Sequence, residues 1–271
     1  MGNPEPRALK PATDRARRRL WEHDRRILKA DTNWLIGVDE VGRGALAGPV
    51  VAAAVALGPE FLTLRSSARD RTLFADSKQL DPRTRQAAWE RIRALEQQQM
   101  LAVALGSADV AEIDRHNILG ATRLAMRRAL ECLAAAADGA WVLPQADGTD
   151  SPLFSRPERA GSPVRLLIDG RPLKPFPYRH EGMVRGDGRS LAIALASIAA
   201  KVSRDREMIQ SEERFSGYGF SAHKGYGTPQ HWQALEKHGP SPWHRRSFLK
   251  TLATGRDLPE KTGEWAFEPD A

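Results

Sequence analysis

Two apolar segments near the N-terminus, separated by a glycine-rich turn, constrain the fold more than any other feature of this chain. The first covers residues 31–41, and the second, residues 49–57, consists of Val, Ala and Leu after a leading proline. Two apolar runs so close together favour a β-hairpin. Because helical patterns and further strand patterns follow in alternation, the sequence predicts a mixed α/β fold in layers.

The remaining elements are read from periodicity and from helix-start signals. Asp81 followed by Pro82 is typical of a helix N-terminus, because Asp caps free backbone amides and Pro suits the first helical position. Apolar residues at 3.6-residue spacing predict a long helix over 111–137. We also expect helices over 13–30, 190–210 and 229–237, and strands over 100–105 and 164–168.

Composition divides the chain into four parts. We expect a polar, arginine-rich N-terminal extension, an α/β domain, a C-terminal part with a further helix and a flexible polar tail, at residues 1–31, 32–210, 211–253 and 254–271. Within the α/β domain, residues 138–163 contain four prolines with scattered Gly and Ser. This composition predicts a mobile surface insertion, to which we assign no function.

Charge and composition exclude several classes of protein. Charged residues make up 28% of the chain, and no apolar run reaches the roughly 18–20 residues that span a bilayer, so a membrane protein is not expected. The N-terminus lacks the apolar middle region of a secretory signal, which favours a cytoplasmic location. The single cysteine, Cys132, excludes an internal disulfide and a thiolate metal cluster. A net charge of +7 is compatible with a polyanionic partner without requiring one.

Two adjacent carboxylates, Asp39 and Glu40, interrupt the first apolar strand. Consecutive strand residues face opposite sides, so both side chains are not expected to be buried without a role. A buried, unpaired carboxylate is costly, and a divalent cation offsets that cost because hard cations prefer carboxylate oxygens. Taken alone, the pair favours an acidic strand end exposed to water, and only the residues that follow change that interpretation.

The segment Gly42-Arg43-Gly44 follows the acidic pair. Glycine lacks a Cβ, so the main chain can approach a ligand closely here, and Arg43 can contact phosphate. A dinucleotide-binding loop is the competing interpretation. It fails because the glycines follow GxGxxxG spacing and because the next segment has the pattern of a strand where that motif requires a helix.

Two later aspartates complete a set of four acids. Asp169 ends the strand over 164–168, and Asp187 lies in an Arg-Gly-Asp-Gly segment, where each alone suits a turn. Together with Asp39 and Glu40 they would form a carboxylate cluster that can hold two Mg²⁺ ions about 3.5–4 Å apart for in-line phosphodiester hydrolysis.

Six ordered motifs make the chain resemble ribonuclease HII over roughly residues 32–250. They are GVDEVGRGALAGPVVAAAV (37–55), DSKQL (76–80), EIDRHNILGATRLAM (112–126), LLIDG (166–170), RGDGRSLAIALASIAAKVSRD (185–205) and HKGYGTPQHWQALEKHGPSPWHRRSF (223–248). The resemblance implies an RNase H-like fold, a mixed sheet flanked by helices with a small helical C-terminal subdomain. It also implies an endoribonuclease that cuts the RNA strand of RNA–DNA hybrids.

The resemblance also carries roles onto individual residues. The catalytic and metal-binding acids map onto Asp39, Glu40, Asp169 and Asp187. The family's glycine-arginine-glycine loop, which reads the ribose 2′-hydroxyl, maps onto Gly42, Arg43 and Gly44, and its substrate-sensing tyrosine maps onto Tyr226. The 2′-hydroxyl is the group that distinguishes RNA from DNA at a given site, so a glycine-rich backbone beside an aromatic ring suits this task.

Several residues compete with these assignments or depart from the family pattern. Asp205 rivals Asp187 as the fourth acid, but an ion pair with Lys201, four residues earlier on a helix, explains it, and Asp187 is preferred. An arginine precedes Gly186 where the family often has lysine, and His223 stands where Asn is common. His231 and His244 have no partner spacing for zinc and are expected at the surface or on phosphate. The basic excess over residues 201–250 predicts a phosphate-contacting face.

The resemblance implies hydrolysis on the 5′ side of a ribonucleotide, including single ribonucleotides in duplex DNA, with two Mg²⁺ or Mn²⁺ ions and with 5′-phosphate and 3′-hydroxyl products. The expected partners are RNA–DNA hybrid and ribonucleotide-containing duplex DNA, bound by a monomer. Two other functions remain open. One is a catalytically silent hybrid-binding module, and the other is a two-metal nuclease or strand-transfer enzyme acting on DNA.

Overall fold

The computed structural model describes residues 14–29, 32–62, 70, 73–74, 80–146 and 164–253. The expectations for residues 1–13, for the tail from residue 254, for most of the DSKQL motif and for residues 147–163 lie outside this part. No helix within the described ranges is both long and apolar enough to cross a membrane.

A five-stranded mixed sheet forms the centre of the molecule, in the order β3-β2-β1-β4-β5. β1 (Trp34–Val41) and β2 (Val50–Leu57) pair antiparallel as the predicted hairpin, and β3 (Leu101–Ala108) pairs antiparallel with β2. On the other side, β4 (Val164–Asp169) runs parallel to β1, and β5 (Glu181–Met183) runs parallel to β4. The predicted α/β fold with a mixed sheet is confirmed, while the short strand β5 was not predicted.

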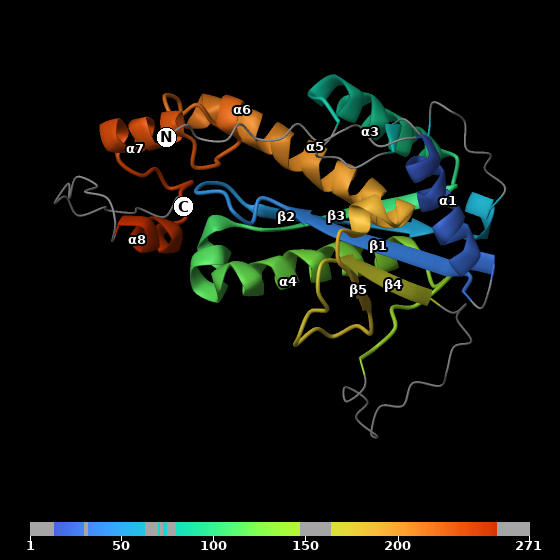
Figure 1. The fold of residues 1–271 in the computed structure, drawn as a ribbon. Coiled ribbons are helices and arrows are strands. Elements are labelled where there is room, and N and C mark those ends of the chain that lie inside the picture. Colours follow the sequence, from blue (N-terminus) through green and yellow to red (C-terminus); the bar gives the residue numbers. More distant parts are fainter. Residues whose placement is uncertain are drawn as a thin grey trace, which may run out of the picture.

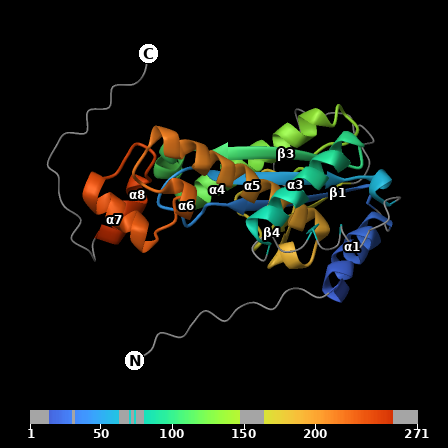
Figure 2. The same ribbon diagram turned by 90° about the horizontal axis from the view of Figure 1, so that it is seen from above.

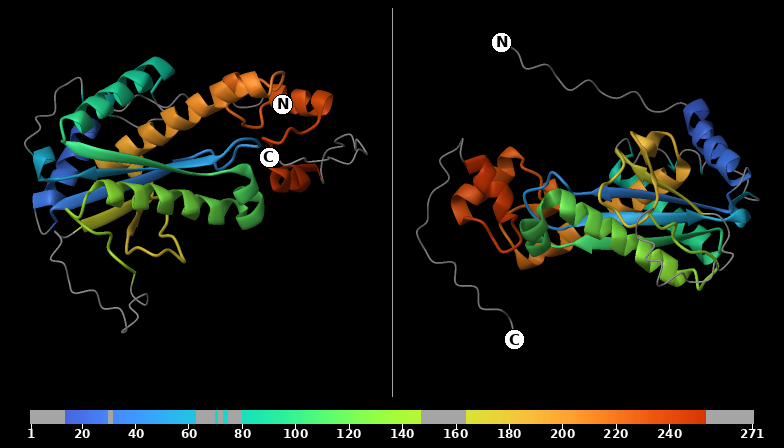
Figure 3. Two further views of the ribbon diagram at one scale, coloured as in Figure 1. Left: turned by 180° about the vertical axis from the view of Figure 1, so that it is seen from behind. Right: turned by 90° about the horizontal axis from the view of Figure 1, so that it is seen from below.

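Helices cover both faces of the sheet (Figure 1). α1 (Asp14–Lys29), α3 (Pro82–Gln97) and α5 (Leu191–Arg214) lie on one face, and α4 (Val110–Ala136) lies on the other, as the view from behind in Figure 3 also shows. Two 3₁₀ turns, η1 (Pro59–Leu62) and η3 (Gly186–Gly188), connect elements. Asp81 caps α3 as predicted, its side chain accepting from the Thr84 amide at 3.0 Å.

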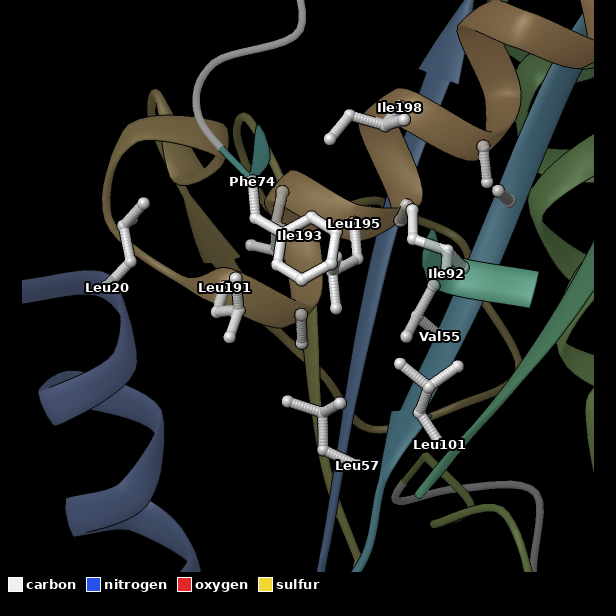
Figure 4. Close-up of a cluster of buried hydrophobic side chains, with 14 of the residues drawn as sticks. Leu20, Val55, Leu57, Phe74, Ile92, Leu101, Leu191, Ile193, Leu195 and Ile198 are labelled. Atoms are coloured by element: carbon white, nitrogen blue, oxygen red, sulfur yellow. The ribbon is translucent and has the colours of Figure 1, made fainter. Parts of the chain in front are cut away.

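The sheet is buried on both faces because successive strand residues point to opposite sides. In β2 every residue is buried. Val55 and Leu57 join the core under α5, whereas Val50 and Ala54 join the core over α4. Figure 4 shows the first of these cores, where side chains of α5 meet residues of β2, β3 and α3: Leu191, Ile193, Leu195 and Ile198 with Val55, Leu57, Leu101 and Ile92.

Helix α1, the second half of the predicted N-terminal extension, is integrated into this core. Trp21 is buried and stacks on Phe61 at 5.2 Å between ring centroids. The fully buried Asp24 caps α5, because its Oδ2 accepts from the Ser190 hydroxyl at 3.0 Å and from the Ala192 amide at 2.8 Å. Residues 14–29 are therefore part of the domain that carries the site.

The predicted surface insertion begins inside the fold. Trp141 and Leu143 are buried in the core between α4 and the sheet, and the Trp141 ring lies 6.1 Å from that of Trp34. Gln145 forms an isolated β-bridge with Tyr178. The prediction of a surface loop is wrong for Trp141 and Leu143, because the proline and glycine content of the segment concealed two core side chains.

Three short helices make up the C-terminal part: α6 (Phe220–His223), α7 (Pro229–His238) and α8 (Arg246–Ala253). They gather beyond one end of the sheet, next to the C-terminal half of α5 (Figure 2). The helical C-terminal part is confirmed, and α7 matches the predicted bounds closely.

Candidate active site

The end of two neighbouring parallel strands brings the first acids together. Val38 of β1 pairs with Ile168 of β4, so Asp39 and Asp169 occupy the next positions of the same register. Glu40 follows Asp39 directly, and its amide donates to Asp39 Oδ1 at 2.8 Å. The carboxyl ends of parallel strands meet at one edge of a sheet, which is where open α/β sheets place their ligands.

Burial and mutual repulsion raise the pKa of the two β1 acids. Asp39 is 4% exposed. Desolvation raises its pKa well above the ordinary value, the charges of Glu40 and Asp169 raise it further, and a hydrogen bond with Ser197 lowers it. Desolvation also raises the pKa of Glu40, against the lowering effect of Arg43, whose Nη1 donates to Glu40 Oε1 at 2.9 Å. The three carboxylates therefore repel one another in a site that favours added positive charge.

One carboxylate oxygen in this cluster has no partner. Glu40 Oε2 is buried without a hydrogen bond. Leaving a buried acceptor unsatisfied is costly, and a hard cation is the partner that carboxylate oxygens suit best. Within the described ranges, no three His, Cys, Asp or Glu side chains already have the arrangement of a metal site. An open site of this kind still fits Mg²⁺, which is held by few carboxylates together with waters and substrate phosphates.

Asp187 lies in the turn η3, which is tied to the same sheet edge. The Gly186 amide donates to Asp169 Oδ1 at 2.6 Å, and Asp187 itself is 5% exposed. A Cβ at Gly186 would lie 2.5 Å from Ile193 Cδ1, so the turn is held tightly against α5. The position of Asp187 beside the acidic cluster is therefore set by Gly186, which hydrogen-bonds to Asp169 and packs against α5.

The rival acid Asp205 has the ion-pair surroundings expected of it. Lys201 Nζ lies 2.6 Å from Asp205 Oδ1, and Arg85 Nη1 lies 3.6 Å from Oδ2. These cations satisfy its charge, which removes the need for a metal there.

The predicted sugar-reading segments lie side by side. The Leu46 amide, in the loop after Gly44, donates to the Gly225 carbonyl at 2.7 Å. Gly42 has a φ of +92°, a conformation that glycine adopts without strain. Tyr226 is half-buried, whereas Arg43 and Gly44 are exposed. The hydrogen-bonded contact between the loops joins residues that are about 180 positions apart in the chain.

Two arginines hold this junction and were missed from the sequence. Arg204 and Arg245 are fully buried, so the predicted phosphate-contacting role of the 201–250 basic residues is wrong for them. Arg204 did carry a signal, because Ala200 and Met208, four residues to either side on α5, share its buried helix face.

The histidine prediction is also wrong. His231 and His244 are 0% and 1% exposed, and their Nε2 atoms lie 3.0 Å apart in the core of the C-terminal part. Desolvation lowers the pKa of His231 to about 4 and that of His244 to about 3. Both rings are neutral near pH 7, so they do not attract phosphate.

The direction of each hydrogen bond follows from the neighbouring amide. Ser241 donates its N–H to His244 Nδ1 at 2.9 Å, so the His244 proton is on Nε2 and is donated to His231 Nε2. His231 then donates from Nδ1 to the Tyr226 carbonyl at 3.0 Å. The histidine pair therefore supports the backbone of the Tyr226 loop.

Comparison with known proteins places residues 36–251 in the family model described as Ribonuclease HII. The chain is 43% identical to ribonuclease HII of Thermosynechococcus vestitus over 219 residues. This match covers 80% of this chain and 85% of that protein. It is 40% identical over 239 residues to ribonuclease HII of Coxiella burnetii, covering 88% of this chain and all of the relative.

Solved structures of similar fold include RNase HII in a complex with PCNA from Archaeoglobus fulgidus, with a TM-score of 0.55 at 22% identity, covering 83% of this chain and 98% of that one. Bst-RNase HIII in complex with Mn²⁺ matches with a TM-score of 0.52 at 19% identity, covering 94% of this chain and 77% of that one. These two likenesses support the fold.

Proposed function

Because the chain belongs to the ribonuclease HII family and is a type 2 ribonuclease H acting on RNA–DNA hybrids, we propose that it also cuts at single ribonucleotides embedded in duplex DNA. Cleavage falls on the 5′ side of the ribonucleotide. The observation that carries the proposal is the cluster of Asp39, Glu40 and Asp169, with the unpartnered Glu40 Oε2, next to the joined Gly42–Gly44 and Tyr226 loops.

The acidic side chains have divided tasks in this proposal. Asp39, Glu40 and Asp169 hold two divalent ions, and Asp187 completes the set from η3. When bound, Mg²⁺ or Mn²⁺ supplies an activated water and stabilises the leaving 3′-oxygen, which gives 5′-phosphate and 3′-hydroxyl ends. Ser197 fixes the orientation of Asp39 through its hydrogen bond.

The glycine loop and Tyr226 choose the substrate. The backbone of Gly42 and Gly44 reaches the ribose without side-chain obstruction, and Tyr226 contacts the nucleotide at the RNA–DNA junction. The guanidinium of Arg43 is 49% exposed while it balances Glu40, so it faces the side from which a phosphate would approach. A DNA nuclease would have no use for this arrangement.

The test is a cleavage assay on duplex DNA that contains one ribonucleotide, with Mg²⁺ or Mn²⁺. Asp39→Asn is expected to abolish cleavage, and Tyr226→Ala to reduce cleavage at the single ribonucleotide. Asp187→Asn and Asp205→Asn form a matched pair, in which the first is expected to lose activity and the second to keep it. The reverse result would reassign the fourth acid.

Each alternative has its own signature in the same assay. A silent binding module would bind hybrid without metal and cut nothing. A DNA nuclease would cut the duplex that lacks a ribonucleotide. Cleavage that survives Asp39→Asn would overturn the assigned site.

A further inference from the structure

Arg204 and Arg245 lie between the Gly42–Gly44 loop and the Tyr226 loop, which together form the proposed ribose-binding site, called the ribose detector below. Arg204 extends from α5, and Arg245 lies directly before α8. Both are 0% exposed. Within the described part of the chain, their hydrogen bonds go to main-chain carbonyls, and neither forms a salt bridge with a carboxylate.

The two guanidinium groups bind one loop from two sides. Arg245 donates to the carbonyls of Arg43, Gly48 and Pro49, at 3.0, 2.9 and 3.1 Å. Arg204 donates to the carbonyls of Ala47, Pro49 and Lys224, at 3.0, 2.9 and 2.9 Å. Pro49 accepts from both. The turn between β1 and β2 is therefore fixed at both ends, and Arg204 also fixes the segment just before Tyr226.

Arg204 touches both halves of the detector. A Cβ added to Gly42 would lie 2.2 Å from Arg204 Nε, so the glycine backbone lies directly against this side chain. On the other side, the Arg204 guanidinium lies 5.5 Å from the centre of the Tyr226 ring. The distance between Gly42 and Tyr226 is thus set by one rigid, planar group between them.

Holding a loop in this way is energetically expensive. Desolvation and the nearby charge of Arg204 together lower the pKa of Arg245 to about 9, against the raising effects of Tyr226 and Asp114. Two buried like charges whose hydrogen bonds go to main-chain carbonyls are a costly substitute for apolar packing. What arginine offers instead is five donors in a fixed fork, which lysine cannot reproduce.

We propose that Arg204 and Arg245 are positioning residues that set the spacing between the Gly42–Gly44 loop and Tyr226, and thereby the preference of the enzyme for RNA–DNA hybrid over DNA duplex. This inference rests on the sugar-reading roles in the proposed function. We call Arg204 and Arg245 with their main-chain hydrogen bonds the arginine clamp. The inference predicts that weakening the clamp lowers the ratio of the affinity for hybrid to the affinity for DNA duplex, and that a loss of stability elsewhere in the fold does not.

The experiment measures the dissociation constants for an RNA–DNA hybrid and for a DNA duplex of the same sequence, with Ca²⁺ in place of the catalytic ion. Arg204→Lys and Arg245→Lys are expected to lower the ratio of the two affinities about tenfold, or about 1.4 kcal/mol. A control away from the loops is Arg128→Lys on α4, where an exposed guanidinium donates to the Ser107 carbonyl at 2.7 Å and pairs with Glu112. Its affinity ratio is expected to stay unchanged.

A second variant tests the spacing without touching either arginine. A Cβ at Gly225 would lie 2.6 Å from the Ala47 carbonyl oxygen, so Gly225→Ala separates the two loops at their contact. We expect the same loss of the affinity ratio. If the lysine variants or Gly225→Ala lower the melting temperature yet keep the wild-type ratio, the clamp is only structural and the inference is overturned.

Failure of the proposed function has a different signature. The wild-type enzyme would then cut an RNA–DNA hybrid but would not cut at a single ribonucleotide in duplex DNA. The affinity ratio of the variants does not depend on this result, because it is measured without cleavage. A lowered ratio in Arg204→Lys, Arg245→Lys and Gly225→Ala would support the inference in either case.

Discussion

Replacing Gly37 by alanine tests whether the packing of α5 on β1 controls the acidic site. Gly37 lies on β1, two residues before Asp39, and the backbone of α5 passes directly over it. An added Cβ would lie 2.3 Å from the carbonyl carbon of Ala192 and 2.4 Å from the amide nitrogen of Ile193. Ordinary contact begins at 3.4 Å, so the shortfall is 3.4 minus 2.3, or 1.1 Å. Backbone atoms cannot rotate away, so the helix must move from the strand.

The movement has two measurable consequences. Overpacking of a well-packed core lowers the free energy of unfolding by about 1–3 kcal/mol. The same movement takes Ser197 away from Asp39, whose carboxylate it orients. A misplacement of about 1 Å at a catalytic group can cost about 100-fold in rate. We therefore expect Gly37→Ala to lower kcat on an RNA–DNA hybrid by about two orders of magnitude.

Gly106→Ala is the matched control, because it creates the same clash on the opposite face of the sheet. A Cβ there would lie 2.3 Å from the Ala125 carbonyl oxygen and 2.4 Å from the Ala129 amide nitrogen, both on α4. Urea unfolding is expected to show similar losses of stability for the two variants. Steady-state kinetics with Mn²⁺ are expected to show a fall in kcat for Gly37→Ala alone. Equal kcat values for the two variants would refute the link between α5 and Asp39.

Three further predictions concern buried charge. The pKa of His231 is lowered from 6.5 to about 4 in the folded protein, so the unfolded chain takes up a proton at this residue first as the pH falls below 6.5. The contribution of His231 to stability is therefore complete above pH 6.5 and declines towards pH 4. Urea unfolding should show a loss of roughly 2 kcal/mol for this residue between pH 7 and pH 5, and a pH-independent stability in that range would contradict the assignment. Asp24→Ala should lower the free energy of unfolding by about 1–3 kcal/mol, more than Asp81→Ala at an exposed helix cap, and thermal denaturation with equal losses would contradict the buried cap. Mn²⁺ should raise the melting temperature of the wild type and not that of Asp39→Asn, since a ligand that binds the folded state stabilises it; an equal rise in both would place the ion elsewhere.

The longer regular elements could be predicted from the sequence, because each is long enough to show its periodicity. The hairpin of β1 and β2 and the helices α3, α4 and α5 were predicted close to their observed positions. The strand β5 has three residues and the helix α6 has four, which is too short for a period of 2 or 3.6 to be visible. Their positions depend on tertiary packing.

The acidic site was partly predictable for a similar reason. Asp39 and Asp169 each stand at a strand end, and parallel pairing of β1 with β4 brings such ends together. The arginine clamp and the histidine pair could not be predicted from residue type, because Arg and His usually lie at the surface. Arg204 is buried because it donates to main-chain carbonyls that are distant in the sequence, such as that of Ala47. His231 is buried because its Nδ1 donates to the Tyr226 carbonyl and its Nε2 accepts from His244.

The acids and the sugar-reading loop are placed together by the way β1 and α5 run alongside each other. A strand rises about 3.3 Å per residue, so Asp39 on β1 and Gly42, the residue directly after β1, are separated by roughly 10 Å. A helix rises about 1.5 Å per residue, so Ser197 and Arg204, seven residues apart on one face of α5, are also separated by about 10 Å. Ser197 hydrogen-bonds to Asp39, and Arg204 lies against Gly42. Because the two spacings match, a shift of α5 along β1 would disturb the acidic cluster and the substrate loop at the same time.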